Sequence, residues 1–176
     1  MKLSDGEKLI LVMLSDIYKH MGIKGEIDAE FVSSAVNTGN AWGLTWKYPG
    51  VFEPEEHERA TVSEVVDILD MWSSIETAYS ELLADERARV DRVKSPLSKT
   101  PRFFGFDGNN ESEHIGVASF LIDDLERFSS FKGRDLNSHF PGSLDIHRRM
   151  LAVFKPIRST LDPFGAEKII SVLEAS

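Results

Sequence analysis

Residues 62–83, VSEVVDILDMWSSIETAYSELL, decide the fold. Their large apolar side chains recur every three or four positions for about six turns, which is the period of an amphipathic helix. The carboxylates of this stretch lie mainly off the apolar stripe. A helix this long, with so wide an apolar face, has to be covered by other elements. The stretch therefore predicts a compact all-α, multi-helix bundle with one long central helix that begins near Thr61 or Ser63.

Shorter helices are predicted on both sides of this stretch. Ser4 and Glu7 form a capping-box pattern that starts the first helix, and Gly22 ends it. Asp28 caps a second helix, which ends at Gly39. Other helices are expected after Asn109 or Asn110, from Ser143 with a kink or end at Pro156, and after Asp162-Pro163. No useful strand alternation or internal repeat is present.

The residues that follow the long helix suggest the organisation of the chain. Residues 85–94 alternate charges of both signs and predict a solvated helical tail. Ser95-Pro96 and Thr100-Pro101 then favour a hinge at residues 95–101. At 176 residues, the chain is expected to form a single domain over residues 1–176 with irregular, aromatic-rich loops.

The composition excludes several classes of protein. With no cysteine, the chain has no disulfide, thiolate zinc site, iron–sulfur cluster or thiol nucleophile. Charged residues follow the N-terminal methionine too soon for a secretory peptide. No apolar run approaches the roughly 20 residues that span a bilayer. We therefore expect a soluble, cytoplasmic protein with no membrane partner.

The charge of the chain is unevenly distributed. The net charge of −9 argues against a general nucleic-acid surface, yet residues 132–158 hold six basic and two acidic residues, a net of +4. Arginine binds anions bidentately and histidine titrates near neutral pH. One hypothesis is an anion site formed by Arg134, His139, His147, Arg148 and Arg149. The alternative is that this segment docks on the acidic remainder of the chain.

Aromatic residues gather between positions 40 and 54. Trp42, Trp46, Tyr48 and Phe52 stand among glycines and prolines, which predicts a turn or two of helix up to Lys47 and then a wrapped loop. These rings can cap the core of the same chain. They can equally form a subunit or partner interface, since tryptophan and tyrosine are favoured there. Both interpretations stay open.

The turn at Arg102–Glu113, RFFGFDGNNESE, suggests metal sites that its residues do not complete. A calcium loop that starts at Asp107 needs glycine and glutamate where Ser112 and Ala118 stand. The Glu111-x-x-His114 pair of a di-metal bundle lacks a second copy. Hydrolase, phosphate-loop and dinucleotide motifs are also missing. We predict no metal, no cofactor and no catalytic residue, and expect the three phenylalanines to anchor the turn in the core.

Four stretches resemble the YfbU family of bacterial proteins. They are GEKLIL from Gly6, VVDILDMW from Val65, RFFGFD from Arg102 and RRMLAVF from Arg148. The resemblance covers nearly the whole chain in the right order. It implies a small helical protein of bacterial origin, and it brings no established reaction and no catalytic residues.

Three functions follow from these observations. The first is a non-enzymatic interaction or regulatory module that forms a homo-oligomer, through residues 42–52 or through an exposed part of the long helix, or binds a protein partner. The second is a small-anion binder or enzyme that uses residues 132–158. The third is DNA binding through the first two helices, which the acidic residues Glu26, Asp28 and Glu30 disfavour.

Overall fold

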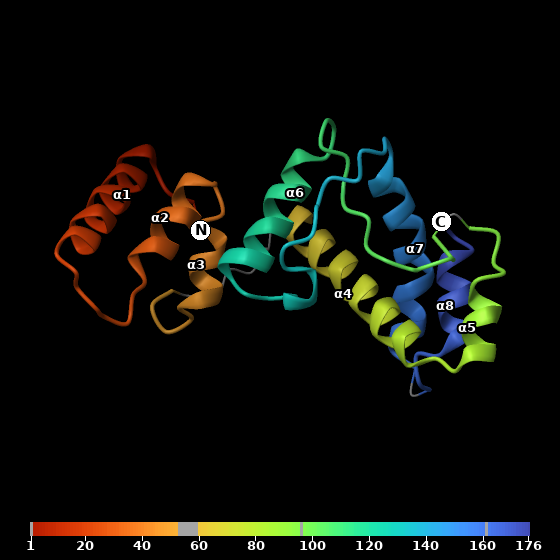
Figure 1. The fold of residues 1–176 in the computed structure, drawn as a ribbon. Helices are drawn as coiled ribbons and strands as arrows, with labels where there is room; N and C mark the ends of the chain where they lie inside the picture. The colour runs from red at the N-terminus through yellow and green to blue at the C-terminus, as the bar shows by residue number, and fades with distance from the viewer. Residues whose placement is uncertain (1, 53–59, 96, 161) are drawn as a thin grey trace.

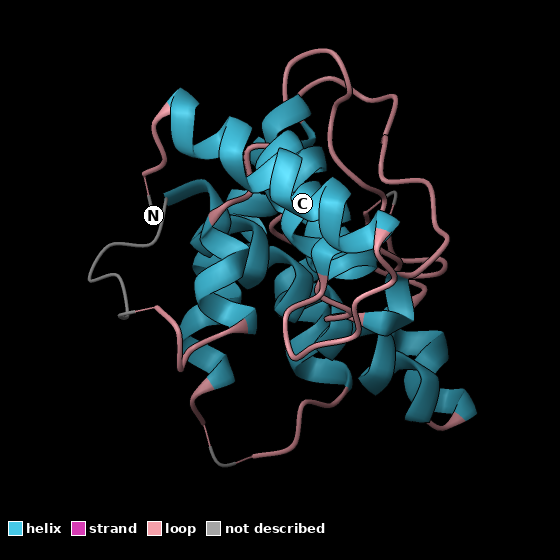
Figure 2. Cartoon of the chain, turned by 90° about the vertical axis from the view of Figure 1, so that its left-hand side faces the viewer, coloured by secondary structure: helices cyan, strands magenta, loops and turns pink. Residues whose placement is uncertain are grey.

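The computed structural model describes residues 2–52, 60–95, 97–160 and 162–176. Within these ranges the chain folds into eight α-helices, one π-helical turn and one 3₁₀ turn, with no strand. The predicted all-α class is confirmed. Figure 1 shows an elongated molecule with helix α1 at one end and helices α5 and α8 at the other. Figure 2, turned by 90°, shows the helices joined by irregular loops.

Helices α1 (Asp5–His20), α2 (Ala29–Asn37) and α3 (Trp42–Lys47) form the N-terminal end of the molecule. The predicted capping box is present, because the Ser4 hydroxyl accepts from the Glu7 amide while the Glu7 carboxylate accepts from the Ser4 amide. The Asp28 carboxylate likewise accepts from two amides at the start of α2. Helix α1 packs against α2, and α2 packs against α3.

Helix α4 (Ala60–Glu81) is the long helix that the sequence predicts. It buries a wide stripe: Val62, Val65, Ile68, Leu69, Met71, Trp72 and Ile75. Helices α6, α7 and α8 pack against it. The expected helical tail is a separate helix, α5 (Ala84–Val90), because the chain turns at Leu82 and Leu83 and a new helix begins there. The Glu86 carboxylate accepts from the Leu83 amide at that new start.

The turn after α5 is anchored as expected, since Phe103 and Phe106 are buried. Gly105 has a positive φ of 86°, and a Cβ there would collide with the carbonyl oxygen of Leu136. Only glycine allows this close approach without strain. The contact is continued by a single parallel bridge between Phe106 and Asn137. Of the predicted hinge at 95–101, Pro96 lies outside the described residues, while Ser98 is buried and bonded to the backbone of Val93 and Ser95.

The C-terminal half adds five elements to α4. Helix α6 (Ser112–Ser119) has Glu111 at its N-cap position rather than the predicted Asn109 or Asn110, and it runs into the π-helical turn Phe120–Asp124. A 3₁₀ turn follows at Ser129–Phe131. Helix α7 (Ser143–Arg158) contains Pro156 near its end, and α8 (Ala166–Leu173) begins after Gly165 instead of at Asp162-Pro163.

One hydrophobic cluster joins α2 and α3 to the helices around α4. Its connection runs through Phe120, whose ring lies 5.5 Å from the rings of Phe31 and Trp42. Helix α1 contributes no fully buried apolar residue to this cluster, and only Leu11 packs against it. Among the described elements, α1 is thus attached to the rim of the core rather than inserted into it.

Candidate functional site

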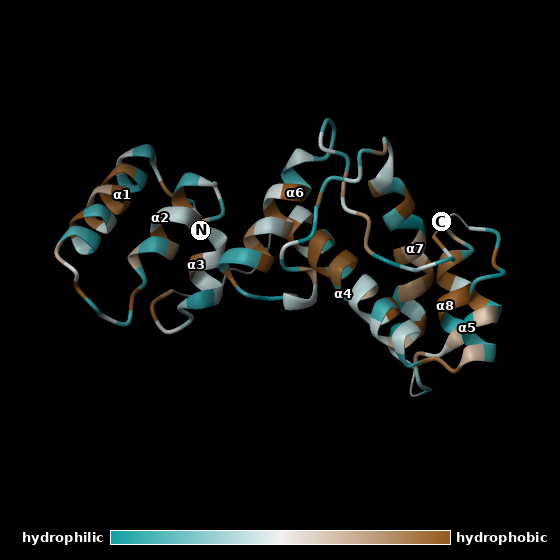
Figure 3. Cartoon of the chain, viewed as in Figure 1, coloured by the Kyte–Doolittle hydropathy of each residue, from teal (hydrophilic) through white to brown (hydrophobic). Residues whose placement is uncertain are grey.

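Helix α1 turns its apolar side away from its own chain. Its buried residue is Ser15, on the side that packs against α2. At roughly 100° per residue, Met13 and Ile17 lie on the opposite side of the helix from Ser15. Figure 3 shows α1 with hydrophobic residues along its length at the end of the molecule. The usual arrangement of an amphipathic helix is therefore reversed here.

Six large apolar side chains make up this outer face, which we call the α1 stripe. Each of them is between 51% and 67% exposed: Leu9, Ile10, Met13, Leu14, Ile17 and Met21. Single exposed apolar residues are common on protein surfaces, but contiguous sets of this size usually mark a contact with another molecule. The stripe is the largest such set along any described helix.

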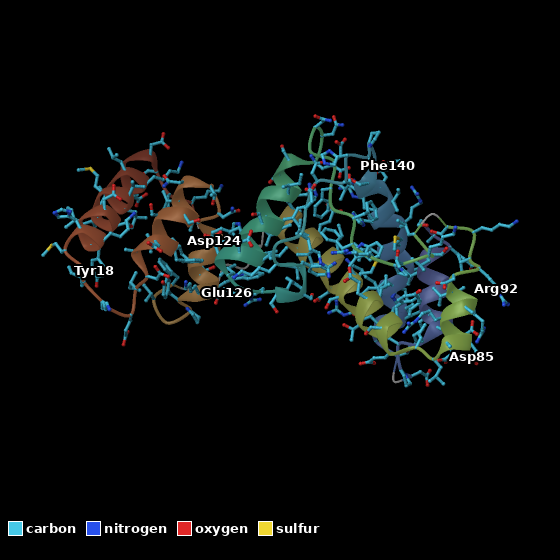
Figure 4. All side chains as sticks on the ribbon, in the orientation of Figure 1. Tyr18, Asp85, Arg92, Asp124, Glu126 and Phe140 are labelled. Atoms are coloured by element: carbon cyan, nitrogen blue, oxygen red, sulfur yellow. The ribbon has the colours of Figure 1, made fainter. Side chains whose placement is uncertain are left out.

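A groove continues the α1 stripe toward α2 and α3. Ile10 and Leu14 line it from α1, the buried Val32 and Leu44 line it from α2 and α3, and the exposed Val51 also lines it. Its volume is about 610 Å³, and its lining is mostly apolar. Figure 4 places Tyr18, which also lines the groove, at the C-terminal end of α1. The stripe and the groove form one continuous apolar surface.

The predicted aromatic interface lies beside this surface, and its most buried residue serves the core. Trp42 is buried, donates its indole N–H to Asn40 Oδ1 at 3.0 Å and packs edge-on against Phe120. Trp46 is partly buried under the Arg127 guanidinium, 4.5 Å from the ring centre. Tyr48 and Phe52 are partly buried and line the groove. The four aromatic residues thus divide into two sets: the Trp42 and Trp46 rings pack on each other at 5.0 Å, and Tyr48 and Phe52 face the groove.

The side chains of the predicted anion site have different partners, although His147, Arg148 and Arg149 are consecutive in the chain. Arg134 makes two 2.8 Å hydrogen bonds to the Glu76 carboxylate, and Arg148 makes bonds of 2.7 and 3.0 Å to Glu64. Glu64 and Glu76 stand twelve residues apart on α4, roughly 18 Å along the helix axis. The two guanidinium groups are therefore held at different turns of α4.

The other three predicted residues have separate surroundings as well. Arg149 donates to the carbonyl oxygen of Ala175 at 3.1 Å, and the exposed His139 lies 3.5 Å from Asp135. His147 is fully buried and faces Trp72 and Gly105. The alternative that the basic segment docks on acidic residues of its own chain describes the contacts of Arg134 and Arg148. Lys155 and Arg158 follow the same pattern, with ion pairs to Asp67.

Several titratable groups form a chain of contacts around the start of α7. His114 Nε2 lies 3.0 Å from Glu64, so its partner is Glu64 rather than Glu111. The Arg148 hydrogen bonds lower the pKa of Glu64 against the opposing effect of burial. For His147, burial disfavours the charged ring and lowers its pKa to about 4. No group of three or more metal-ligating side chains forms among the residues that the structure describes.

The α1 stripe was not singled out by the sequence as a surface. Its residues were recognised as a helical apolar face, and such faces are normally covered by the same chain. The pattern of a helix gives the position of its apolar face but not the partner that covers it.

The fold and this surface together define a class of protein: an all-α protein whose terminal helix presents an uncovered apolar face. The chain belongs to the YfbU family, whose model, described as the YfbU domain, matches residues 1–175. A UPF0304 protein of Methanocaldococcus jannaschii is 29% identical over 116 residues, which are 63% of this chain and 65% of that protein. The match thus spans slightly less than two thirds of the relative.

These comparisons bear on origin and on function. The resemblance implied a bacterial family, but this relative is archaeal. The family is therefore not confined to bacteria. The name of the relative assigns no activity. No solved structure matches the chain at a significant level. Within the described residues, the structure has no helix with the length and apolar character needed to cross a membrane.

Proposed function

We propose that the protein is a non-enzymatic interaction module that self-associates through the α1 stripe. The observation that carries this proposal is the orientation of α1, whose apolar side points away from the core of its own chain. Water contact with this side is unfavourable, and an apolar partner surface removes it. The proposed contact lies on α1 instead of on residues 42–52, of which Tyr48 and Phe52 line the adjoining groove.

The size of the apolar surface supports a stable contact. Six side chains that are each more than half exposed offer on the order of 600 Å², the upper range for an apolar patch on a typical monomer. Standard protein–protein interfaces bury about 800 Å² on each partner, with a rim that is more polar than the centre. The stripe with the neighbouring groove therefore approaches the area that one face of a dimer needs.

The composition of α1 favours a protein partner over a lipid surface. Helices that lie on membranes carry a polar face rich in lysine and arginine, with aromatic residues on the apolar face. Helix α1 has three carboxylates against two lysines, and its stripe contains no aromatic residue. Anionic lipid headgroups would repel such a helix more than they attract it.

Neither alternative function gains a specific observation. The guanidinium groups proposed for an anion site already bind carboxylates or a carbonyl oxygen of the same chain. For DNA binding, the start of α2 presents Asp28 and Glu30, where a recognition helix would meet phosphates. We therefore keep self-association as the proposed function.

Sedimentation analysis of two charged variants tests this proposal. Met13→Glu and Ile17→Glu each place a charge in the α1 stripe, where desolvation would make association costly. The wild-type protein is expected to sediment as an oligomer and both variants as monomers, with unchanged helical circular dichroism. The matched control is Leu83→Glu, because Leu83 is 69% exposed but lies between α4 and α5.

The control variant should associate like the wild type. A wild-type protein that stays monomeric at high concentration would rule out self-association. Equal loss of association in the Leu83→Glu variant would show that charge alone, rather than the stripe, controls the effect.

A further inference from the structure

The charges beside the α1 stripe form an ordered row. Along one edge stand Asp5, Lys8, Asp16 and Lys19, in the order acidic, basic, acidic, basic. Lys8 pairs with Asp5 at 2.9 Å, and Lys19 pairs with Asp16 at 3.0 Å. The two pairs lie eleven residues apart, close to three full turns, so they share one side of the helix. This edge runs between the stripe and the side that packs against α2.

The row is complementary to a reversed copy of itself, because each acidic residue then stands opposite a basic residue. In an antiparallel pair related by a two-fold axis, this edge of one helix meets the same edge of the other. One register then sets Asp5 opposite Lys19 of the second copy and Lys8 opposite its Asp16. Because the symmetry repeats both contacts, all four charges on each helix meet an opposite charge, while the intrachain pairs can persist beside them.

A parallel pair lacks this match. Its two-fold axis runs along the helices, so the charged edge of one copy meets the opposite edge of the other. That opposite edge holds Glu7 and Tyr18 and no basic residue. Asp5 would then lie at the level of Glu7, and the Asp16–Lys19 pair would face an uncharged stretch. In a parallel pair, the two helix dipoles also point in the same direction, so that like ends lie side by side. In an antiparallel pair, opposite ends lie side by side, which is favourable.

We propose that the second copy docks on the α1 stripe in the antiparallel direction, with α1 against α1. This inference depends on the proposed function, because it assigns the geometry of that same self-association. The charge register also fits the stripe. It brings Gly6 to within about one residue, roughly 1.5 Å along the axis, of Ile17 of the second copy. Gly6 has open space where a side chain would be, so the Ile17 side chain of the other copy fits there.

Engineered cysteines can measure the direction, because the chain has no cysteine of its own. Gly6→Cys and Ile17→Cys are made singly and together, and each protein is oxidised and run on a non-reducing gel. A disulfide requires Cα atoms within about 7 Å. In the proposed register, each position lies roughly 15 Å or more from its own symmetry copy. The two positions are also roughly 16 Å apart within one helix, so they cannot bridge inside a chain.

We expect a covalent dimer from the double variant and none from either single variant. Covalent dimers from the single variants would indicate a parallel pair and overturn the inference. The inference is also overturned if the double variant stays uncrosslinked while sedimentation shows it to be dimeric, although self-association then stands. A wild-type protein that is monomeric in sedimentation removes the proposed function itself. Circular dichroism of each variant establishes that α1 and the rest of the fold are retained.

Discussion

At the scale of single residues, His147 is the most enclosed titratable group around the start of α7. Its side chain is fully buried and stacks on Phe104, with ring centres 4.5 Å apart. The Trp72 indole can only donate, so His147 Nδ1 accepts its N–H at 3.1 Å. The Nε2 atom must then carry the proton, which it donates to the Gly105 carbonyl oxygen at 2.9 Å. Both nitrogens are satisfied only while the ring is neutral.

This geometry predicts that the protein loses stability in mild acid. The pKa of His147 falls from 6.5 to about 4 on folding, so between these values the unfolded chain binds a proton that the folded chain does not. The stabilisation is therefore fully present above pH 6.5 and is lost as the pH falls toward 4. We expect the free energy of unfolding to drop by about 2 kcal/mol between pH 7 and pH 5 from this group alone.

Urea unfolding of the wild type and of a His147→Gln variant at pH 7, 6 and 5 measures this contribution. Glutamine keeps a donor and an acceptor but does not titrate, so the variant should show a smaller loss of stability over the same interval. Glu64 does not interfere, because its pKa is lowered from 4.5 and its contribution is lost only below that value. An identical pH dependence in both proteins would contradict the assignment.

At the scale of elements, the start of α7 is capped by a carboxylate from a distant part of the chain. Glu111 is buried at the start of α6 and accepts from the Leu144 amide at 2.9 Å and the Ser143 hydroxyl at 2.6 Å. It also accepts from the Asp107 amide at 2.8 Å. A negative charge at this position stabilises the dipole of α7 and the amides of its first turn, which have no partner within the helix. Glu111 thus couples the Phe103–Phe106 turn, α6 and α7.

Removing this carboxylate should destabilise the fold strongly. Glu111→Ala leaves three donors without their acceptor inside the protein, and we expect a loss of about 3 kcal/mol in the free energy of unfolding. The matched control is Glu113→Ala on the first turn of the same helix, where the side chain is exposed and the expected change is within about 0.5 kcal/mol. Thermal and urea unfolding measure both. If Glu111→Ala lowers the free energy of unfolding no more than Glu113→Ala does, the Glu111 cap does not stabilise the fold.

Local chemistry explains which elements the sequence could predict. The Ser4–Glu7 capping box and the Asp28 cap involve residues within one turn, and both were predicted correctly. The Glu111 cap of α7 joins residues 32 and 33 positions apart, so no local pattern contains it. The break at Leu82–Leu83 was missed for a similar reason, since the apolar period continues across it while the tertiary contacts of α5 with α8 require a turn.

The candidate site shows the same limit more clearly. The apolar residues of α1 were identified from their spacing, but their exposure depends on how α1 is placed against α2. In the basic segment, the types of residue suggested anion binding, whereas the partners of Arg134 and Arg148 lie 58 and 84 positions away. Sequence patterns report what a side chain can bind. Long-range packing decides what it does bind.

At the scale of the whole molecule, the uneven charge of the chain is partly neutralised within it. Four of the six basic residues of the 132–158 segment form ion pairs with Glu64, Asp67 and Glu76 of α4: Arg134, Arg148, Lys155 and Arg158. The best-enclosed of these pairs is Arg134–Glu76, whose side chains are 19% and 18% exposed. The exposed pairs contribute little individually and are screened by salt. Together they fix how α7 and the preceding loop lie against α4.

This arrangement predicts a specific response to anions. Phosphate at millimolar concentration should raise the melting temperature no more than sodium chloride of equal ionic strength, because an added anion has to displace a carboxylate that is already bound bidentately. Thermal shift measurements on the wild type and an Arg148→Ala variant test this. A phosphate-specific rise of several degrees that disappears in the variant would restore the anion-site hypothesis. An equal, small response to both salts in both proteins would instead mean that the arginines of this acidic protein serve to attach α7 and its preceding loop to α4.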